Sequence, residues 1–139
     1  MTGADVVRVA RTFAGVRYRH QGRSRDGLDC VGLPICVRAE LGLPGMDFSG
    51  YAKVALDSQM LDLCRAHLVE VQRTDLQLGD LLVQTDGIVR HMAIVADCVY
   101  GGFSIIHAWL PNRRVVECRL DDYFMQTVRG CFRFPEVVV

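Results

Sequence analysis

The apolar residues change their spacing midway along the chain, and this change constrains the fold more than any other feature of the sequence. In the N-terminal half they recur at i, i+3 and i+4, the spacing of an amphipathic helix, between residues that cap or stop helices. Aspartate suits the N-cap position, so Asp29 and Asp57 are expected to begin two of these helices. The predicted helices cover residues 4–13, 29–41 and 57–67.

Short runs rich in β-branched and aromatic residues follow, and glycine, aspartate or proline separates them. The predicted strands cover residues 68–72, 81–84, 92–96, 103–107, 115–119 and 128–134. Short turns of this kind join antiparallel neighbours. Helices followed by an antiparallel sheet predict an α+β fold with segregated elements, and a length of 139 residues suits a single domain, 1–139.

The composition argues against several classes of function. The formal net charge is zero, whereas domains that bind duplex nucleic acid usually carry a basic excess, so no nucleic-acid partner is expected. No apolar run approaches the roughly 18 residues of a membrane span, and residues 1–5 do not resemble the start of a signal peptide. We therefore expect no membrane insertion, and synthesis in a reducing compartment where the six cysteines stay unpaired.

The cysteines form no C-x-x-C motif, and none lies at zinc-finger spacing from paired histidines, so neither a metal nor another cofactor is expected. Cys30 differs from the others because it stands at a predicted helix start. The positive end of the helix dipole and the free backbone N–H groups there favour the thiolate and can stabilise an oxyanion. Position alone is nevertheless more typical of a buried core cysteine than of a nucleophile.

Two histidines can supply the groups that a nucleophilic cysteine requires. His91 begins a predicted strand, and His107 ends the next one. Neighbouring antiparallel strands can bring two such side chains together on one face of a sheet. Cys30, His91 and His107 would then be nucleophile, base and orienting group. His67, at a predicted helix end where a cation is stabilised, is interpreted as structural.

Four segments, in this order along the chain, resemble the signature of NlpC-type peptidoglycan endopeptidases. Tyr18 precedes Asp29-Cys30-Val31-Gly32-Leu33, as a tyrosine precedes the Asp-Cys-Ser-Gly-Leu helix start of that family. The other segments are Leu78-Gly79-Asp80-Leu81-Leu82, His91-Met92-Ala93-Ile94-Val95 and Ile106-His107-Ala108. The resemblance covers about residues 13 to 108, and its strength lies in the combination of the four segments.

The resemblance implies a papain-like fold, with N-terminal helices packed on a C-terminal antiparallel sheet. It implies a cysteine peptidase that cuts peptidoglycan stem peptides, typically next to a D-glutamyl–diaminopimelate bond. Cys30 would be the nucleophile, His91 the general base and acid, and His107 the orienting group. Tyr18 would form the oxyanion site together with the backbone N–H of Cys30.

Two residues next to the nucleophile depart from the family pattern. Val31 replaces the usual serine, and Pro34 replaces an ordinary helix residue. Both changes leave Cys30 in place, but they affect the start of the helix that carries it. A missing N–H is tolerated in the first helical turn, so a helix through Pro34 is still expected.

Charged residues in the loop before Cys30 are candidates for substrate binding. If this loop borders the cleft, its arginine forks face a substrate that is rich in carboxylates. The candidates are Arg19, Arg23, Arg25 and Asp29. The alternative is that the arginines belong to a solvated loop.

The form of the cysteine motif also resembles one group within the family. Phage tails and the related gene-transfer particles carry small, single-domain NlpC-like peptidases. The resemblance implies a tail-tip component that is made in the host cytoplasm and opens peptidoglycan in the periplasm and cell wall during genome delivery. Its partners would be stem peptides and tail-hub or tail-tip proteins.

A carrier of this kind requires a docking surface, for which residues 132–139 and 48–51 are candidates. Residues 132–139 are equally typical of an edge strand that covers the core. Two alternatives to the tail peptidase also remain open. One is a structural tail-hub subunit with little activity, and the other is a cytoplasmic amidase or acyltransferase on the same scaffold.

Overall fold

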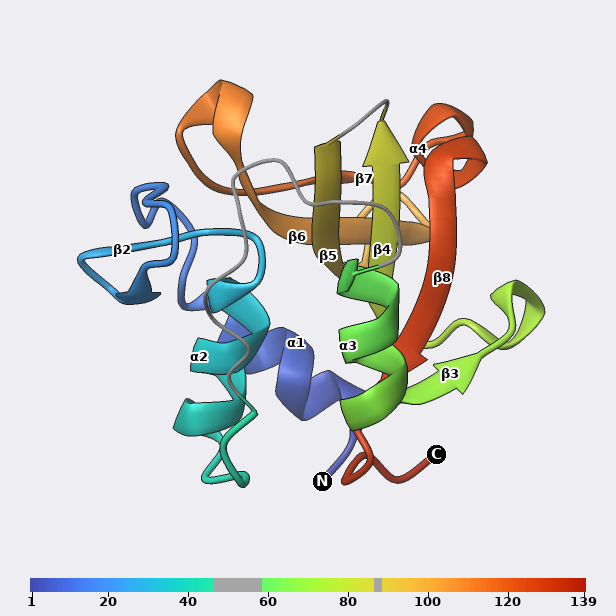
Figure 1. Ribbon diagram of the computed structural model, residues 1–139. Helices are drawn as coiled ribbons and strands as arrows, with labels where there is room; N and C mark the ends of the chain where they lie inside the picture. The colour runs from blue at the N-terminus through green and yellow to red at the C-terminus, as the bar shows by residue number, and fades with distance from the viewer. Residues whose placement is uncertain (47–58, 87–88) are drawn as a thin grey trace.

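The C-terminal part of the chain forms a six-stranded sheet in which all neighbouring strands are antiparallel. The computed structural model describes residues 1–46, 59–86 and 89–139, and its strand order is β3-β8-β4-β5-β6-β7 (Figure 1). The strands are β3 (Val69–Val71), β4 (Leu81–Asp86), β5 (Val89–Asp97), β6 (Phe103–Trp109), β7 (Arg114–Arg119) and β8 (Val128–Arg133). All six predicted strands are confirmed, because each is an apolar run that ends at a turn.

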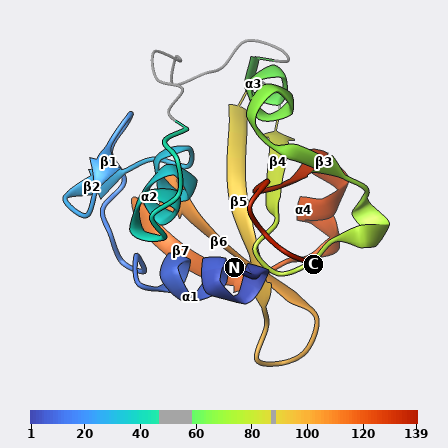
Figure 2. The same ribbon diagram turned by 90° about the horizontal axis from the view of Figure 1, so that it is seen from below.

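The three predicted helices are present as α1 (Gly3–Arg11), α2 (Gly32–Glu40) and α3 (Gln59–His67). They share an apolar core with the sheet. Figures 1 and 2 show the arrangement of these helices and the sheet from two directions. The predicted N-cap Asp57 and the predicted docking loop 48–51 lie outside the described residues. Within the described parts of the chain, no helix has both the length and the apolar composition that crossing a membrane requires.

Several short elements were not predicted from the sequence. A two-stranded hairpin lies within the polar loop before Cys30, and a fourth helix precedes the last strand. Two 3-10 turns also occur on the surface. These elements are β1 (Arg23–Ser24), β2 (Gly27–Leu28), α4 (Asp122–Thr127) and the 3-10 turns Arg73–Asp75 and Leu110–Asn112.

Alternation along the strands divides the buried side chains between the two faces of the sheet. Met92 on β5 belongs to the core shared with α1, α2 and α3. Its neighbour Ala93 belongs to a second core, which Phe124 of α4 covers on the opposite face. His91 has the same parity as Ala93, and its ring lies 6.4 Å from that of Phe124, so the His91 side chain is directed toward the α4 face.

The C-terminal segment is packed into the fold, which corrects its predicted role as a docking surface. Strand β8 lies inside the sheet, between β3 and β4, and both Phe132 and Phe134 are buried. Arg38 of α2 donates to the two carboxylate oxygens of Glu136 at 2.7 and 3.0 Å. Only Val138 and Val139 are strongly exposed among the apolar side chains of this segment, and they form too small a patch to mark a docking surface.

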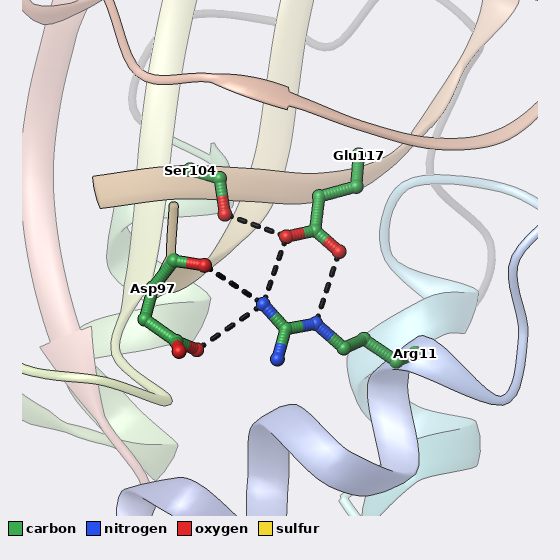
Figure 3. Close-up of polar contacts among 4 residues, drawn as sticks. All are labelled: Arg11, Asp97, Ser104 and Glu117. Atoms are coloured by element: carbon green, nitrogen blue, oxygen red, sulfur yellow. Dashed lines mark hydrogen bonds and ion pairs between the residues drawn. The ribbon is translucent and has the colours of Figure 1, made fainter. Parts of the chain in front are cut away.

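Arg11, the last residue of α1, connects that helix to three strands, as Figure 3 shows. Its Nε and Nη2 atoms donate to the carboxylate of Glu117 on β7 at 3.1 and 3.0 Å. Nη2 also donates to the Asp97 carbonyl on β5 at 2.8 Å, and Ser104 on β6 donates to Glu117 at 2.7 Å. Because the Arg11 side chain is 40% exposed, this cluster orients α1 more than it stabilises the fold.

Asp80, at the start of β4, provides a direct test of the buried polar contacts. Its carboxylate is fully buried and accepts hydrogen bonds from Arg133 Nε at 2.7 Å and Nη2 at 2.8 Å. We expect Asp80→Asn to lower the free energy of unfolding by about 2 to 4 kcal/mol, because it leaves a poorly exposed guanidinium without its counterion. Urea denaturation measures the change.

The exposed ion pair between Arg65 and Glu70 is the matched control for this experiment, since both side chains are 49% exposed. The substitution Glu70→Gln should change the unfolding free energy by less than about 1 kcal/mol. Equal losses for Asp80→Asn and Glu70→Gln would contradict the stabilising role assigned to the buried pair.

Candidate active site

Cys30 lies in the turn that leads into α2. The helix itself begins at Gly32, two or three residues later than the predicted start at Cys30 or Asp29. Its hydrogen bonds nevertheless reach back to Asp29, whose carbonyl accepts from Leu33 N–H at 3.1 Å and whose carboxylate accepts from Gly32 N–H at 2.8 Å. The structure therefore contains the capping contact expected of Asp29, and Cys30 is placed at the positive end of the helix.

The two departures from the family pattern are compatible with this helix start. Val31 is buried in the main core, where a serine would leave a hydroxyl among apolar side chains. Pro34 is the third residue of α2, within the first turn, where the N–H groups have no partner inside the helix. Neither residue displaces Cys30.

The Asp29 carboxylate connects the preceding loop to the helix start through hydrogen bonds. It is 1% exposed and, besides Gly32 N–H, accepts from Gln21 N–H at 2.8 Å and Arg23 Nη1 at 3.2 Å. A Cβ at Gly32 would lie 2.2 Å from the Gly22 carbonyl oxygen, so only glycine permits this close approach. Asp29 and Arg23, both predicted to bind substrate, are thus engaged within the protein.

The other two arginines predicted to bind substrate are placed differently. Arg25 donates to the carbonyl and hydroxyl of Thr12 at 2.9 and 3.0 Å and to Glu40 at 3.0 Å, and it stacks over the Phe13 ring. It therefore holds the loop against the ends of α1 and α2. Arg19 is exposed on the same loop, so substrate binding by Arg19 stays a prediction.

The cysteine occupies the place where β5 and β6 separate. Their registered pairs run only from Asp97↔Phe103 to Ile94↔Ile106, although β5 continues along β4 to Val89. The registered pairs with β6 do not extend to residues 89–93 of β5. In this part of β5 the backbone of Met92 is hydrogen-bonded to the Cys30 thiol. The sulfur therefore lies against the residue that follows His91.

The two histidines predicted for the site are in direct contact. His91 Nε2 and His107 Nδ1 lie 2.6 Å apart, and both side chains are buried. The second ring nitrogen of His107, Nε2, lies 3.5 Å from the sulfur of Cys118 on β7. This places Cys118, which sequence analysis did not select, at the far end of a chain of polar contacts.

Burial keeps the central groups of the site neutral. It is the main cause that raises the pKa of Cys30 to about 12, and the Asp29 charge adds to it. Burial, followed by the neighbouring His107, holds the pKa of His91 well below its ordinary value, and burial lowers the pKa of His107 to about 4. The expected thiolate at the helix start is therefore wrong for the free protein: hydrogen bonds from the backbone of Met92, Cys30 and Val31 favour it, but desolvation outweighs them.

Tyr18 lies close to the nucleophile. It is half-buried against the main core, and its N–H donates to the Arg113 carbonyl at 2.9 Å. The pKa of its phenol is raised first by burial and then by the charges of Cys30 and Asp29. The hydroxyl is thus protonated and can act as a hydrogen-bond donor, as the oxyanion role predicted for Tyr18 requires.

A cavity of about 510 Å³ opens beside His107 on the α4 face of the sheet. Its wall combines aromatic side chains with charged and amide groups, a lining typical of small-molecule and peptide sites. The ring of Trp109 stacks on His107, with centroids 5.1 Å apart. Residues of this wall include Gln84, His107, Trp109, Cys118, Arg119, Asp121, Tyr123 and Phe124.

Most residues of the cavity wall were missed from the sequence, although one signal was available. Trp109 follows His107 by two positions, just beyond the predicted strand 103–107; the observed strand β6 extends to Trp109, and the two side chains share one face. Tyr123 and Phe124 belong to the unpredicted α4, and no pattern connected them to the histidines. Among the described residues, no group of three or more histidine, cysteine or acidic side chains is placed to hold a metal ion.

Comparisons with known proteins give one consistent result at the level of the fold. No protein-family model matches the sequence, and no curated protein matches it. The NlpC/p60 domain of the peptidoglycan hydrolase SagA is similar with a TM-score of 0.68 and 21% identity, over 96% of this chain and 100% of that one. An NlpC/P60 family protein from Bacillus cereus ATCC 10987 is similar with a TM-score of 0.71 and 22% identity, over 96% of this chain but 40% of that one.

A third similar structure is an N-acetylmuramoyl-L-alanine amidase from Bacteroides uniformis ATCC 8492, with a TM-score of 0.61 and 13% identity. The match covers 94% of this chain and 96% of that protein. These likenesses establish the papain-like α+β fold of NlpC/p60 domains.

The depressed histidine pKa values predict how stability depends on pH. An unfolded histidine takes up a proton as the pH falls below about 6.5, while His107 in the folded protein, with a pKa of about 4, does not. The stabilisation is thus present above pH 6.5 and is lost as the pH falls toward 4. The free energy of unfolding of the wild type should therefore fall between pH 7 and 5. In His107→Gln we expect this fall to be smaller by about 1 to 2 kcal/mol.

Chemical denaturation at several pH values measures this difference. His67→Gln is the matched control, because His67 is exposed at the end of α3. The same pH dependence in the wild type and in His107→Gln would show that the buried neutral histidine does not contribute.

Proposed function

We propose that this protein is a cysteine hydrolase that cuts the peptide stems of bacterial peptidoglycan. The observation that supports this most directly is the position of Cys30 at a helix start, with its thiol on the backbone of Met92, next to a His91–His107 pair joined at 2.6 Å. Nucleophile, base and orienting group come from the turn before α2, from β5 and from β6, within a fold that is similar to that of NlpC/p60 domains. The peptidoglycan hydrolase SagA, with the same fold, supports the class of substrate.

The proposed reaction begins from a neutral pair. His91 Nε2 is engaged with His107, so Nδ1 is the nitrogen that accepts the Cys30 proton. Because the pKa of the thiol is raised and that of His91 is lowered, no stable ion pair forms in advance, and proton transfer accompanies the attack of sulfur on the carbonyl carbon. His91 then gives this proton to the leaving amine, and water hydrolyses the thioester through the same base.

Two donors stabilise the negative oxygen of the tetrahedral intermediate. The backbone N–H of Cys30 lies at the positive end of α2, and the protonated hydroxyl of Tyr18 is the second donor. His107 keeps the His91 ring in orientation through the 2.6 Å contact and accepts a hydrogen bond from it when His91 becomes charged.

The cavity beside His107 is proposed to hold part of the stem peptide. Arg119 in its wall can pair with a substrate carboxylate, and the aromatic side chains cover apolar parts of the peptide. The exposed Arg19 offers a second site for a carboxylate. A cut next to a D-glutamyl–diaminopimelate bond is the specific reaction that the sequence resemblance favours.

One structural neighbour favours a second candidate reaction. The Bacteroides uniformis protein is an N-acetylmuramoyl-L-alanine amidase with the same fold. An amidase or acyltransferase would use the same cysteine and histidines on a different carbonyl. Mass spectrometry of fragments released from sacculi separates the two reactions, because an amidase frees whole stem peptides and an endopeptidase leaves a shortened stem on the glycan.

We expect a graded set of losses when site residues are changed. Cys30→Ala should abolish the release of fragments, and His91→Ala should lower the rate by about 10²- to 10⁴-fold, as loss of a general base does. His107→Ala should lower it less, because His107 orients His91 without receiving the thiol proton. Liquid chromatography of the fragments released from sacculi measures the rates.

The exposed His67 supplies the control, and His67→Ala should keep nearly the wild-type rate. Equal losses for His67→Ala and His91→Ala would refute the assignment of the base. A wild-type protein that releases no fragment, although it is folded, would favour the structural tail-hub alternative.

We also propose that the protein acts as a component of a phage-type tail or gene-transfer particle, an assignment that rests on the Asp29-Cys30-Val31-Gly32-Leu33 form of its motif. Its proposed partners there are tail-hub or tail-tip proteins. Proteomics of purified particles should detect the chain at few copies. Its recovery in the soluble cell fraction alone would instead support the cytoplasmic amidase.

A further inference from the structure

Cys118 has no role in the reaction described above, yet its sulfur lies 3.5 Å from Nε2 of His107. It lies on β7, opposite Ile105 and two residues after Val116, the residue that pairs with His107. His91, His107 and Cys118 therefore form a series of contacts that ends in the cavity wall, and Cys30 lies against the backbone of Met92, the residue that follows His91.

The direction of the hydrogen bonds along this series decides whether His91 can act as a base. In one arrangement His91 carries its proton on Nε2 and donates to His107 Nδ1. His107 then carries its proton on Nε2 and donates to the Cys118 sulfur. In the reverse arrangement the Cys118 S–H donates to His107 Nε2, His107 donates to His91 Nε2, and the His91 proton moves to Nδ1. Only the first arrangement leaves His91 Nδ1 free to accept the thiol proton.

The surroundings of Cys30 favour the first arrangement. The backbone groups of Met92, Cys30 and Val31 favour negative charge on its sulfur. In this buried site the Cys30 proton therefore needs an acceptor, and a His91 that carried its proton on Nδ1 could not be that acceptor. A sulfur atom at the far end that accepts from His107 completes the same orientation.

From this geometry, and building on the proposed function, we infer that Cys118 is a positioning residue that accepts a hydrogen bond from His107 Nε2 and thereby fixes the tautomer in which His91 is a base. Cys118 does not touch the reacting atoms. Cys118 is an exposed residue of the cavity wall, and partial desolvation of its thiol together with the charges of Asp121 and Glu117 raises its pKa, so the thiol remains protonated near neutral pH.

Nitrogen NMR of the histidine rings tests this inference without reference to activity. In protein labelled with ¹⁵N-histidine, two-bond ¹H–¹⁵N correlations distinguish the two neutral tautomers of His107. We expect the wild type to show the Nε2–H form of His107 and His91, and Cys118→Ala to show a mixture of tautomers. A wild-type His107 protonated on Nδ1 would overturn the inference.

Activity on a soluble stem peptide supplies the second measurement. Cys118→Ala should lower kcat by roughly five- to tenfold, the effect of about one hydrogen bond, and leave KM within about twofold. Cys118→Ser, which restores an acceptor, should recover most of kcat. A rise in KM with kcat unchanged would instead make Cys118 only a part of the cavity wall, and would overturn the inference.

Cys98 provides matched substitutions away from the site, in the turn that joins β5 to β6. Cys98→Ala and Cys98→Ser should leave both the tautomers and kcat at the wild-type values. If the wild type cuts no stem peptide, the proposed function fails, but the tautomer of His107 and its response to Cys118→Ala still decide the inference.

Discussion

The buried carboxylate of Asp29 is the contact on which the geometry of the site depends. It joins the backbone of the loop at Gln21, the side chain of Arg23 and the first N–H of α2 at Gly32. Burying a carboxylate at 1% exposure is costly unless it is hydrogen-bonded, so these donors offset the cost of its burial. Because Cys30 is the next residue, any movement of this group would move the nucleophile.

The same carboxylate has an electrostatic consequence for its neighbour. A helix start stabilises a thiolate, but the negative charge of Asp29 and the absence of solvent around the sulfur oppose it, and together they raise the pKa of Cys30 to about 12. The arrangement that positions the cysteine thus also keeps it protonated until a substrate arrives.

The sequence could predict the order of elements and the residues of the central pair, because both depend on local patterns. Apolar spacing located α1, α2, α3 and the six strands of the sheet, and strand parity brought His91 and His107 to one face. Burial of the thiol could not be predicted in this way, since desolvation depends on the whole fold. The contact of Cys118 with His107 and the position of α4 over the sheet depend on the register between distant strands, which one sequence does not reveal.

A histidine as orienting group suits a site that is buried and neutral. An aspartate in the place of His107 would carry a charge into the core and would raise the pKa of His91 by favouring its charged form. His107 instead is neutral and brings no negative charge to His91, so burial is the main cause that holds the pKa of His91 low. His91 is therefore unprotonated throughout the neutral pH range, but it is a weak base. The barrier to proton transfer must then be lowered where charge develops, at the oxyanion donors Tyr18 and Cys30 N–H and along the hydrogen bond from His91 to His107.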